Sequence, residues 1–146
     1  MAAVRTAEAV WEHDLAKGSG RVKGLSGALP ETPVSWAART ETASGGKTSP
    51  EELLAAAHAS CFSMALAAGL GRGGTPPERL SVSASVTFDK VGEAWKVTTS
   101  HLVVKGKVPG STQEKFAAAA KAASEGCPIS GALHGNVAIS VQATLE

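Results

Sequence analysis

Apolar and polar residues alternate along the first third of the chain in short runs separated by turn residues. These runs cover Val4 to His13, Gly20 to Gly27 and Val34 to Thr42, and prolines precede the third. Alternation with a period of two is typical of strands with one buried face. The pattern predicts three strands in meander order.

The strongest predicted element is an apolar helix in the middle of the chain. Ser49 can accept a hydrogen bond from the third helical residue, and Pro50 fits the first helical position. Residues 53–70 are almost all apolar or small, interrupted only by His58, Ser60 and Ser63. A helix without a broad polar face is typical of a buried position. We therefore expect it at the centre of the fold.

The second half of the chain combines strands and helices. Residues 80–88 alternate as a strand, and residues 93–105 follow as its hairpin partner. Residues 112–126 form an amphipathic helix, residues 127–135 a turn or short helix, and residues 137–145 a closing strand. This order predicts an α+β protein with an antiparallel sheet, folded as a single domain over residues 1–146.

Composition and charge limit the classes of partner and the cellular compartment that we expect. The net charge is +1, from 14 basic and 13 acidic residues, so we expect neither nucleic acid nor an anionic membrane as a partner. The start of the chain lacks the basic and apolar regions of a signal peptide, which favours the cytoplasm. Two cysteines are too few for a secreted disulfide scaffold, but they suit a thiol pair in a reducing compartment.

The two cysteines have unlike settings. Cys61 lies three turns into the apolar helix, where a free cysteine is most often a small buried apolar residue. Cys127 lies between Gly126 and Pro128, at a helix boundary where backbone N–H groups can stabilise a thiolate. No spacing rule joins cysteines this far apart in sequence. Two interpretations therefore remain open, a functional pair of thiols and two structural cysteines that do not meet.

The residues also allow two other chemistries to be compared with a thiol pair, a zinc site and a serine hydrolase. Four side chains have the number and type needed for a tetrahedral zinc site, namely His58, Cys61, Cys127 and His134, but their spacing matches no standard zinc motif. No serine lies in a G-x-S-x-G elbow, which argues against a serine hydrolase. We expect no metal and no cofactor.

Two segments together resemble the paired signature of the OsmC/Ohr family of peroxide-resistance proteins. They are TSPEELLAAAHASCFSM at 48–64 and GCPISGAL at 126–133. The histidine of HASCFSM and the CPIS form of the second segment are more similar to the OsmC branch. The resemblance covers essentially the whole chain. It implies an OsmC-like fold, in which antiparallel sheets wrap around a central buried helix in an intertwined homodimer.

The resemblance also implies the roles of individual residues. Cys61 corresponds to the peroxidatic cysteine and Cys127 to the resolving cysteine. Glu51 matches the active-site glutamate. The active-site arginine corresponds to Arg39, in the strand expected before the helix, if the OsmC branch applies, and to Arg21 if the Ohr branch applies. We expect Arg39.

These roles imply a thiol-dependent peroxidase that reduces organic hydroperoxides, and hydrogen peroxide more slowly, in defence against oxidative stress. Cys61 would become a sulfenic acid and then form a disulfide with Cys127. An external dithiol, by resemblance of the lipoyl type, would restore both thiols. A general disulfide oxidoreductase is disfavoured by the lack of a C-x-x-C motif. The alternative is a non-catalytic redox sensor or a dimer that binds apolar ligands on the same fold.

Overall fold

The computed structural model describes all residues, 1–146, and combines strands with helices. This mixture confirms the α+β class. The backbone divides into two compact units, Met1–Leu53 and Leu54–Glu146. The interpretation of residues 1–146 as a single domain stays a prediction.

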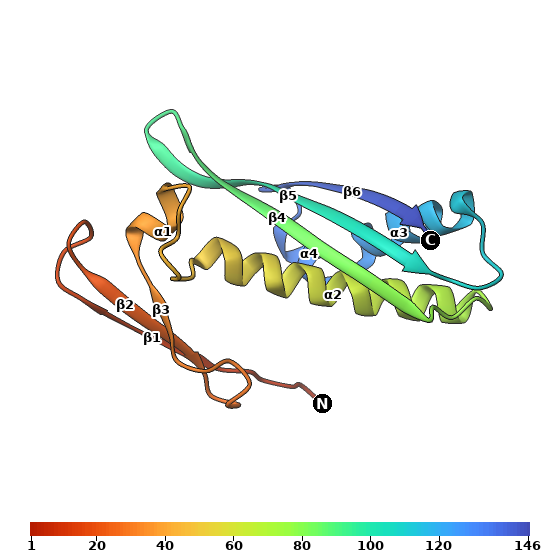
Figure 1. Cartoon of the computed structure of the whole chain (residues 1–146), viewed down its shortest axis with the longest axis horizontal. Coiled ribbons are helices and arrows are strands. Elements are labelled where there is room, and N and C mark those ends of the chain that lie inside the picture. Colours follow the sequence, from red (N-terminus) through yellow and green to blue (C-terminus); the bar gives the residue numbers. More distant parts are fainter. The chain divides into compact units, whose positions relative to one another are not determined.

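The first unit contains a sheet of three strands, β1 (Ala7–Glu12), β2 (Ser19–Gly24) and β3 (Thr32–Val34) (Figure 1). The strands lie in the order β1-β2-β3, and each neighbouring pair is antiparallel. This arrangement is the predicted meander.

A short helix, α1 (Trp36–Thr40), replaces most of the third predicted strand. Ser35 precedes it in an extended conformation, and its Oγ accepts a hydrogen bond from the Ala38 N–H at 3.1 Å. A serine in this position satisfies a backbone donor that would otherwise be free, so it favours a helix start. The prediction of a strand up to Thr42 was therefore wrong, and Arg39 lies on a helix.

The long helix α2 (Pro50–Arg72) begins as predicted. Ser49 Oγ accepts from the Glu52 N–H at 3.1 Å, and Pro50 is the first helical residue. The helix has the length and composition of a membrane-crossing helix, but one of its faces belongs to the core of the second unit. That face carries the buried residues His58, Phe62, Leu66 and Leu70.

The other face of α2 is exposed in the single chain, although almost all of its residues are apolar or small. Four exposed residues lie three or four positions apart along it, namely Ala57, Ser60, Met64 and Ala68. The Met64 side chain is 67% exposed. Within one chain, α2 is therefore buried on one face only, whereas the sequence predicted burial on most sides.

The second unit contains a sheet of β4 (Arg79–Val91), β5 (Ala94–Lys107) and β6 (Ala138–Leu145), in that order. β4 and β5 form the predicted antiparallel hairpin, whose turn contains Gly92 at φ +62°. β6, however, lies parallel to β5, so this part of the antiparallel prediction was wrong. Two helices, α3 (Gln113–Gly126) and α4 (Pro128–Leu133), supply the long crossover that a parallel pair requires.

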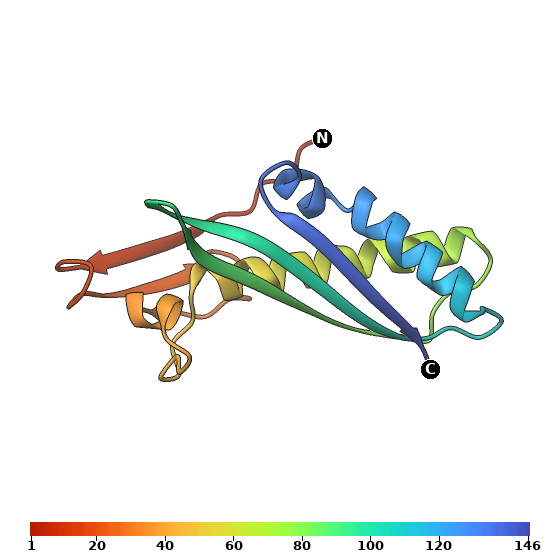
Figure 2. The same cartoon turned by 90° about the horizontal axis from the view of Figure 1, so that it is seen from above.

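Helices α2 and α3 lie on the same face of this sheet (Figures 1 and 2). The core between them consists of buried side chains from α2, β5 and α3, among them Phe62, Leu102 and Phe116. Gly106 on β5 permits this packing, because a Cβ atom there would collide with the Phe116 ring. Cys127 belongs to the same buried cluster, so the core holds one of the two thiols in place.

Candidate active site

The second unit brings Cys61 of α2 and Cys127 together. Their Sγ atoms are 3.1 Å apart, and both residues are free cysteines. Cys127 is buried and Cys61 is partly buried. A disulfide requires an S–S distance of about 2 Å, so a small movement would join them. Sequence spacing gave no sign of this proximity.

Cys127 is held by the junction between two helices. It ends α3, where its N–H donates to the Ala123 carbonyl at 3.0 Å, and it also precedes α4. Its Sγ accepts a hydrogen bond from the Ser130 N–H at 3.4 Å, and Pro128 occupies the start of α4. The sequence Gly-Cys-Pro therefore places the sulfur where a side-chain acceptor normally caps a helix.

The two thiols differ in acidity. Burial raises the pKa of Cys61, and the neighbouring Cys127 raises it further. A hydrogen bond from the Ile129 N–H lowers this pKa, but the overall shift is upward. Burial also raises the pKa of Cys127, but hydrogen bonds from the Ser130 hydroxyl and N–H, together with those from Cys61 and the Ile129 N–H, outweigh it, and the pKa of Cys127 is lowered overall. The two sulfurs also share a hydrogen-bond contact at 3.1 Å, which favours the protonated form of Cys61. A thiolate on Cys61 therefore needs a further cation.

A buried histidine lies one turn before Cys61. His58 Nδ1 is 2.7 Å from Ser100 Oγ on β5, and its Nε2 is 2.8 Å from Ser130 Oγ on α4. Both ring nitrogens are thus occupied by hydroxyl groups. No group of three His, Cys, Asp or Glu side chains is arranged to hold a metal ion. The four residues considered for a zinc site therefore do not form a metal-binding cluster.

Sequence reasoning missed Ser100 and Ser130. Ser130 belongs to the CPIS segment and could have been considered for that reason. Ser100 gave no signal, because nothing in the sequence relates it to a histidine 42 positions away.

The first unit brings Arg39 and Glu51 together. Arg39 Nη2 is 2.7 Å from Glu51 Oε1, and Nε is 3.2 Å from both carboxylate oxygens. The centroid of the Trp36 ring lies 5.6 Å from the guanidinium carbon of Arg39. The Glu51 side chain is only 8% exposed, and a forked contact of this kind fixes the orientation of both groups.

Arg21, the alternative arginine, lies elsewhere in the same unit. It contacts Glu12 and Glu31 on the surface, at 3.4 and 3.6 Å. Its side chain is 46% exposed. Of the two arginines, Arg39 is therefore the one that contacts Glu51.

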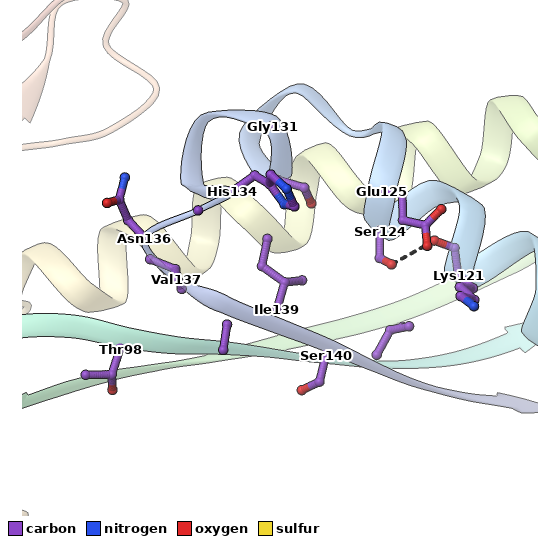
Figure 3. A pocket seen from close by; sticks show the side chains of 14 residues that line it. Thr98, Lys121, Ser124, Glu125, Gly131, His134, Asn136, Val137, Ile139 and Ser140 are labelled. Carbon is purple, nitrogen blue, oxygen red and sulfur yellow. Dashed lines mark hydrogen bonds between the residues drawn. The ribbon is translucent and has the colours of Figure 1, made fainter.

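A large pocket of the second unit does not contain the thiol pair. It has a volume of about 1040 Å³ and lies beside α3, α4 and β6. Lys121, Ser124 and Glu125 of α3 lie opposite Val137 and Ile139 (Figure 3). Neither cysteine lines it, so its size alone does not mark the site of the chemistry.

Comparison with known proteins decides the family. A family model described as OsmC-like protein matches residues 43–142, a span that includes Glu51 and both cysteines. The chain belongs to the OsmC-like protein family.

An OsmC-like curated relative, Peroxiredoxin OsmC of Escherichia coli, is 38% identical over 135 residues, which cover 92% of this chain and 93% of the relative. Among solved structures, the organic hydroperoxide resistance protein OhrB of Bacillus subtilis has a TM-score of 0.73 and 26% identity, covering 95% of this chain and 98% of its own. A Legionella pneumophila OsmC protein has a TM-score of 0.73 and 25% identity, covering 98% and 99%. The OsmC-like fold predicted from the two motifs is confirmed.

Proposed function

We propose that this OsmC-like protein is a two-cysteine peroxidase that reduces organic hydroperoxides to alcohols. The observation that carries the proposal is the 3.1 Å separation of the Cys61 and Cys127 sulfurs in a chain 38% identical to a peroxiredoxin. The chain is thus a peroxidase of the OsmC-like family. Its substrate class is supported by the hydroperoxide resistance proteins among its structural relatives.

The reaction begins at Cys61. Its thiolate attacks one peroxide oxygen, the O–O bond breaks, and the alcohol leaves after taking up a proton, so that Cys61 becomes a sulfenic acid. The Cys127 thiolate then attacks the Cys61 sulfur. The S–S bond forms, the S–O bond breaks, and the hydroxide released is protonated to water. The alcohol and water together account for both peroxide oxygens.

A second substrate must return two electrons to the disulfide. An external dithiol does this by attacking one sulfur and then closing its own disulfide. A dithiol of the lipoyl type is the reductant that we propose. Cys61 and Cys127 are then both thiols again.

The cation that activates Cys61 is Arg39 in this proposal. An arginine stays charged when it is desolvated, and its fork can also donate to a peroxide oxygen. Glu51, bonded to Arg39 through three contacts, orients that fork. Arg39 is preferred over Arg21 because it is the arginine that contacts Glu51.

A homodimer completes the proposal. The exposed face of α2 around Met64 is too apolar to be an ordinary solvated helix face. A second copy of the chain would cover it, and we expect the dimer to work in the cytoplasm. A dry apolar surrounding would also accept the alkyl group of an organic hydroperoxide.

The test is peroxide consumption with lipoamide, glutathione and thioredoxin systems in parallel. Repeated turnover with one of these reductants supports the proposed peroxidase. Consumption that stops after one equivalent per chain with all three would indicate a stoichiometric redox sensor instead. No consumption at all would favour a dimer that binds apolar ligands.

A further inference from the structure

A buried network that the mechanism above does not use lies next to Cys127. His58, Ser100 and Ser130 are 0%, 0% and 2% exposed. The His58 ring joins the two hydroxyls, at 2.7 Å through Nδ1 and at 2.8 Å through Nε2. The network therefore connects α2 with β5 on one side and with α4 on the other.

The network has only two possible hydrogen-bond directions. Burial lowers the pKa of His58, so the ring is neutral and has one donor and one acceptor nitrogen. If Nδ1 donates to Ser100, Nε2 must accept the Ser130 hydroxyl proton, which is then not available to any other group. If Nε2 donates to Ser130, the Ser130 hydroxyl keeps its proton for another acceptor, and Ser100 donates to Nδ1.

The Cys127 sulfur is the acceptor that the geometry offers beside Ser130, because Cys127 caps the helix that contains Ser130 and the His58 ring holds the Ser130 oxygen. The Ser130 N–H already lies 3.4 Å from it. Although burial raises the pKa of Cys127, the Ser130 hydroxyl and N–H lower it. A hydroxyl stabilises a thiolate only by donating its proton to the sulfur. This requires the second direction, with the ring proton on Nε2.

We propose that His58 is a positioning residue whose Nε2–H holds the Ser130 oxygen, so that the Ser130 hydroxyl donates to the Cys127 sulfur. Ser100 fixes the direction by donating to Nδ1. The hydrogen bonds then run from Ser100 through His58 and Ser130 to Cys127. Each member donates to the next.

The network acts on the two steps in which Cys127 carries the negative charge, and it rests on the proposed function for these steps. In the first, Cys127 attacks the Cys61 sulfenic acid and hydroxide leaves. In the second, a dithiol sulfur bonds to Cys61 and Cys127 leaves as a thiolate. A stabilised thiolate is both more populated and a better leaving group. The peroxide-reducing step at Cys61 does not use the network.

The first experiment titrates Cys127 directly. In a Cys61→Ala chain Cys127 is the only thiol, and its ionisation can be followed by ultraviolet thiolate absorbance without reagent access. The chain has no tyrosine, so no phenolate band interferes. In this background Ser130→Ala removes the hydroxyl and keeps the backbone N–H. His58→Leu removes the Nε2 donor, and His58→Gln supplies an amide N–H in its place.

A control comes from a second histidine–serine bond, which joins β5 to β6. His101 Nδ1 lies 2.7 Å from Ser140 Oγ in an exposed contact, so Ser140→Ala removes a histidine–serine bond that involves neither thiol. We expect Ser130→Ala and His58→Leu to move the Cys127 titration to higher pH, and His58→Gln and Ser140→Ala to follow the parent. A Ser130→Ala titration equal to that of Ser140→Ala overturns the proposal. Equal titrations of His58→Gln and His58→Leu overturn the role of His58.

The second experiment separates this inference from the proposed function. In the chain with both cysteines, mass spectra after one equivalent of hydroperoxide follow the Cys61 sulfenic acid and the disulfide in time. Ser130→Ala should slow disulfide formation about threefold, because a tenfold smaller thiolate fraction is partly offset by a more nucleophilic sulfur. Sulfenic acid formation should not slow, because Cys127 raises the pKa of Cys61 less when it carries less negative charge. A parent that consumes no peroxide contradicts the peroxidase, whereas an active parent with unchanged Cys127 titrations contradicts only the network.

Discussion

The sulfur atoms of Cys61 and Cys127 lie 3.1 Å apart, although the residues are separated by 66 positions in the chain. The pair is also asymmetric. Hydrogen bonds from Ser130 favour the thiolate of Cys127, whereas burial disfavours that of Cys61. Proximity would allow a disulfide to form, and the raised pKa of Cys61 means that its thiolate needs additional stabilisation.

Exchange of each cysteine for serine should separate their roles. Cys61→Ser should abolish turnover, because no other thiol then receives the peroxide oxygen. Cys127→Ser should still reduce one equivalent and leave Cys61 as a sulfenic acid, open to further oxidation. Intact-mass spectra after one equivalent of peroxide detect both results. An oxygen adduct on Cys127 of an active Cys61→Ser protein would reverse the assignment, and the lower pKa of Cys127 makes this control necessary.

The order of the helices and most strands could be predicted from the sequence because their signals are local. Ser49 and Pro50 marked the start of α2, and alternation marked β4. The helix α1 could not be predicted from alternation, because Val34, Trp36 and Ala38 alternate like a strand, whereas the Ser35 cap decides for a helix. The parallel position of β6 follows from a crossover, which strand periodicity does not report.

For the candidate site, the two sequence motifs predicted only the residues that lie within them. They named Cys61, Cys127 and Glu51. The contacts at and around these residues are long-range, such as Cys61 with Cys127, 66 positions away, and His58 with Ser130, 72 positions away. Periodicity and spacing carry no information about such contacts.

Arg39→Ala should raise the pKa of Cys61, because an adjacent cation favours the thiolate and its loss favours the thiol. The thiolate fraction at neutral pH should fall about tenfold or more, with a matching loss of peroxidase activity. The pH dependence of alkylation in a Cys127→Ser background measures the change. Arg21→Ala, which removes an exposed arginine with two surface contacts, is the matched control. If Arg21→Ala raises the pKa and Arg39→Ala does not, the Ohr branch describes the mechanism.

Catalytic efficiency should rise with the alkyl chain length of the hydroperoxide and be lowest for hydrogen peroxide. Each methylene that an apolar surface removes from water can contribute up to about 0.8 kcal/mol to binding. The surface that we expect to bind it includes Met64, whose side chain is exposed in the single chain. Comparison of kcat/KM across a series of hydroperoxides measures the effect. Equal values for hydrogen peroxide and a medium-chain hydroperoxide would contradict the prediction.

His58 should make the protein less stable in mild acid. Burial lowers its folded pKa, so below the usual value of about 6.5 the unfolded chain binds a proton that the folded chain does not. The free energy of unfolding should fall as pH falls through this value, by at most about 1.4 kcal/mol per pH unit for one proton. Urea midpoints across pH, at one protein concentration, should show this slope in the parent and not in His58→Gln. Parallel curves would exclude His58 as the cause.

The last prediction is that Glu51 of one chain serves Cys61 of the other. Ten helical residues separate Glu51 from Cys61 along α2, which corresponds to about 15 Å of axial rise. A glutamate side chain cannot span that distance within one helix, and α2 runs without a break from Pro50 to Arg72. Antiparallel helices across a twofold axis would bring the start of one beside the middle of the other. Arg39 would accompany Glu51, because the two side chains are bonded within one chain.

Subunit mixing tests this arrangement. Co-expressed Cys61→Ser and Glu51→Ala chains form a heterodimer in which, if sites are shared, one site carries both substitutions and the other carries neither. The heterodimer should then recover about half of the parent activity, because a twofold dimer has two equivalent sites. If Glu51 acts within its own chain, every site has one substitution, and the heterodimer should be no more active than the Glu51→Ala homodimer. Since both outcomes are measured on folded dimers of the same composition, a difference in activity reports which chain supplies the glutamate.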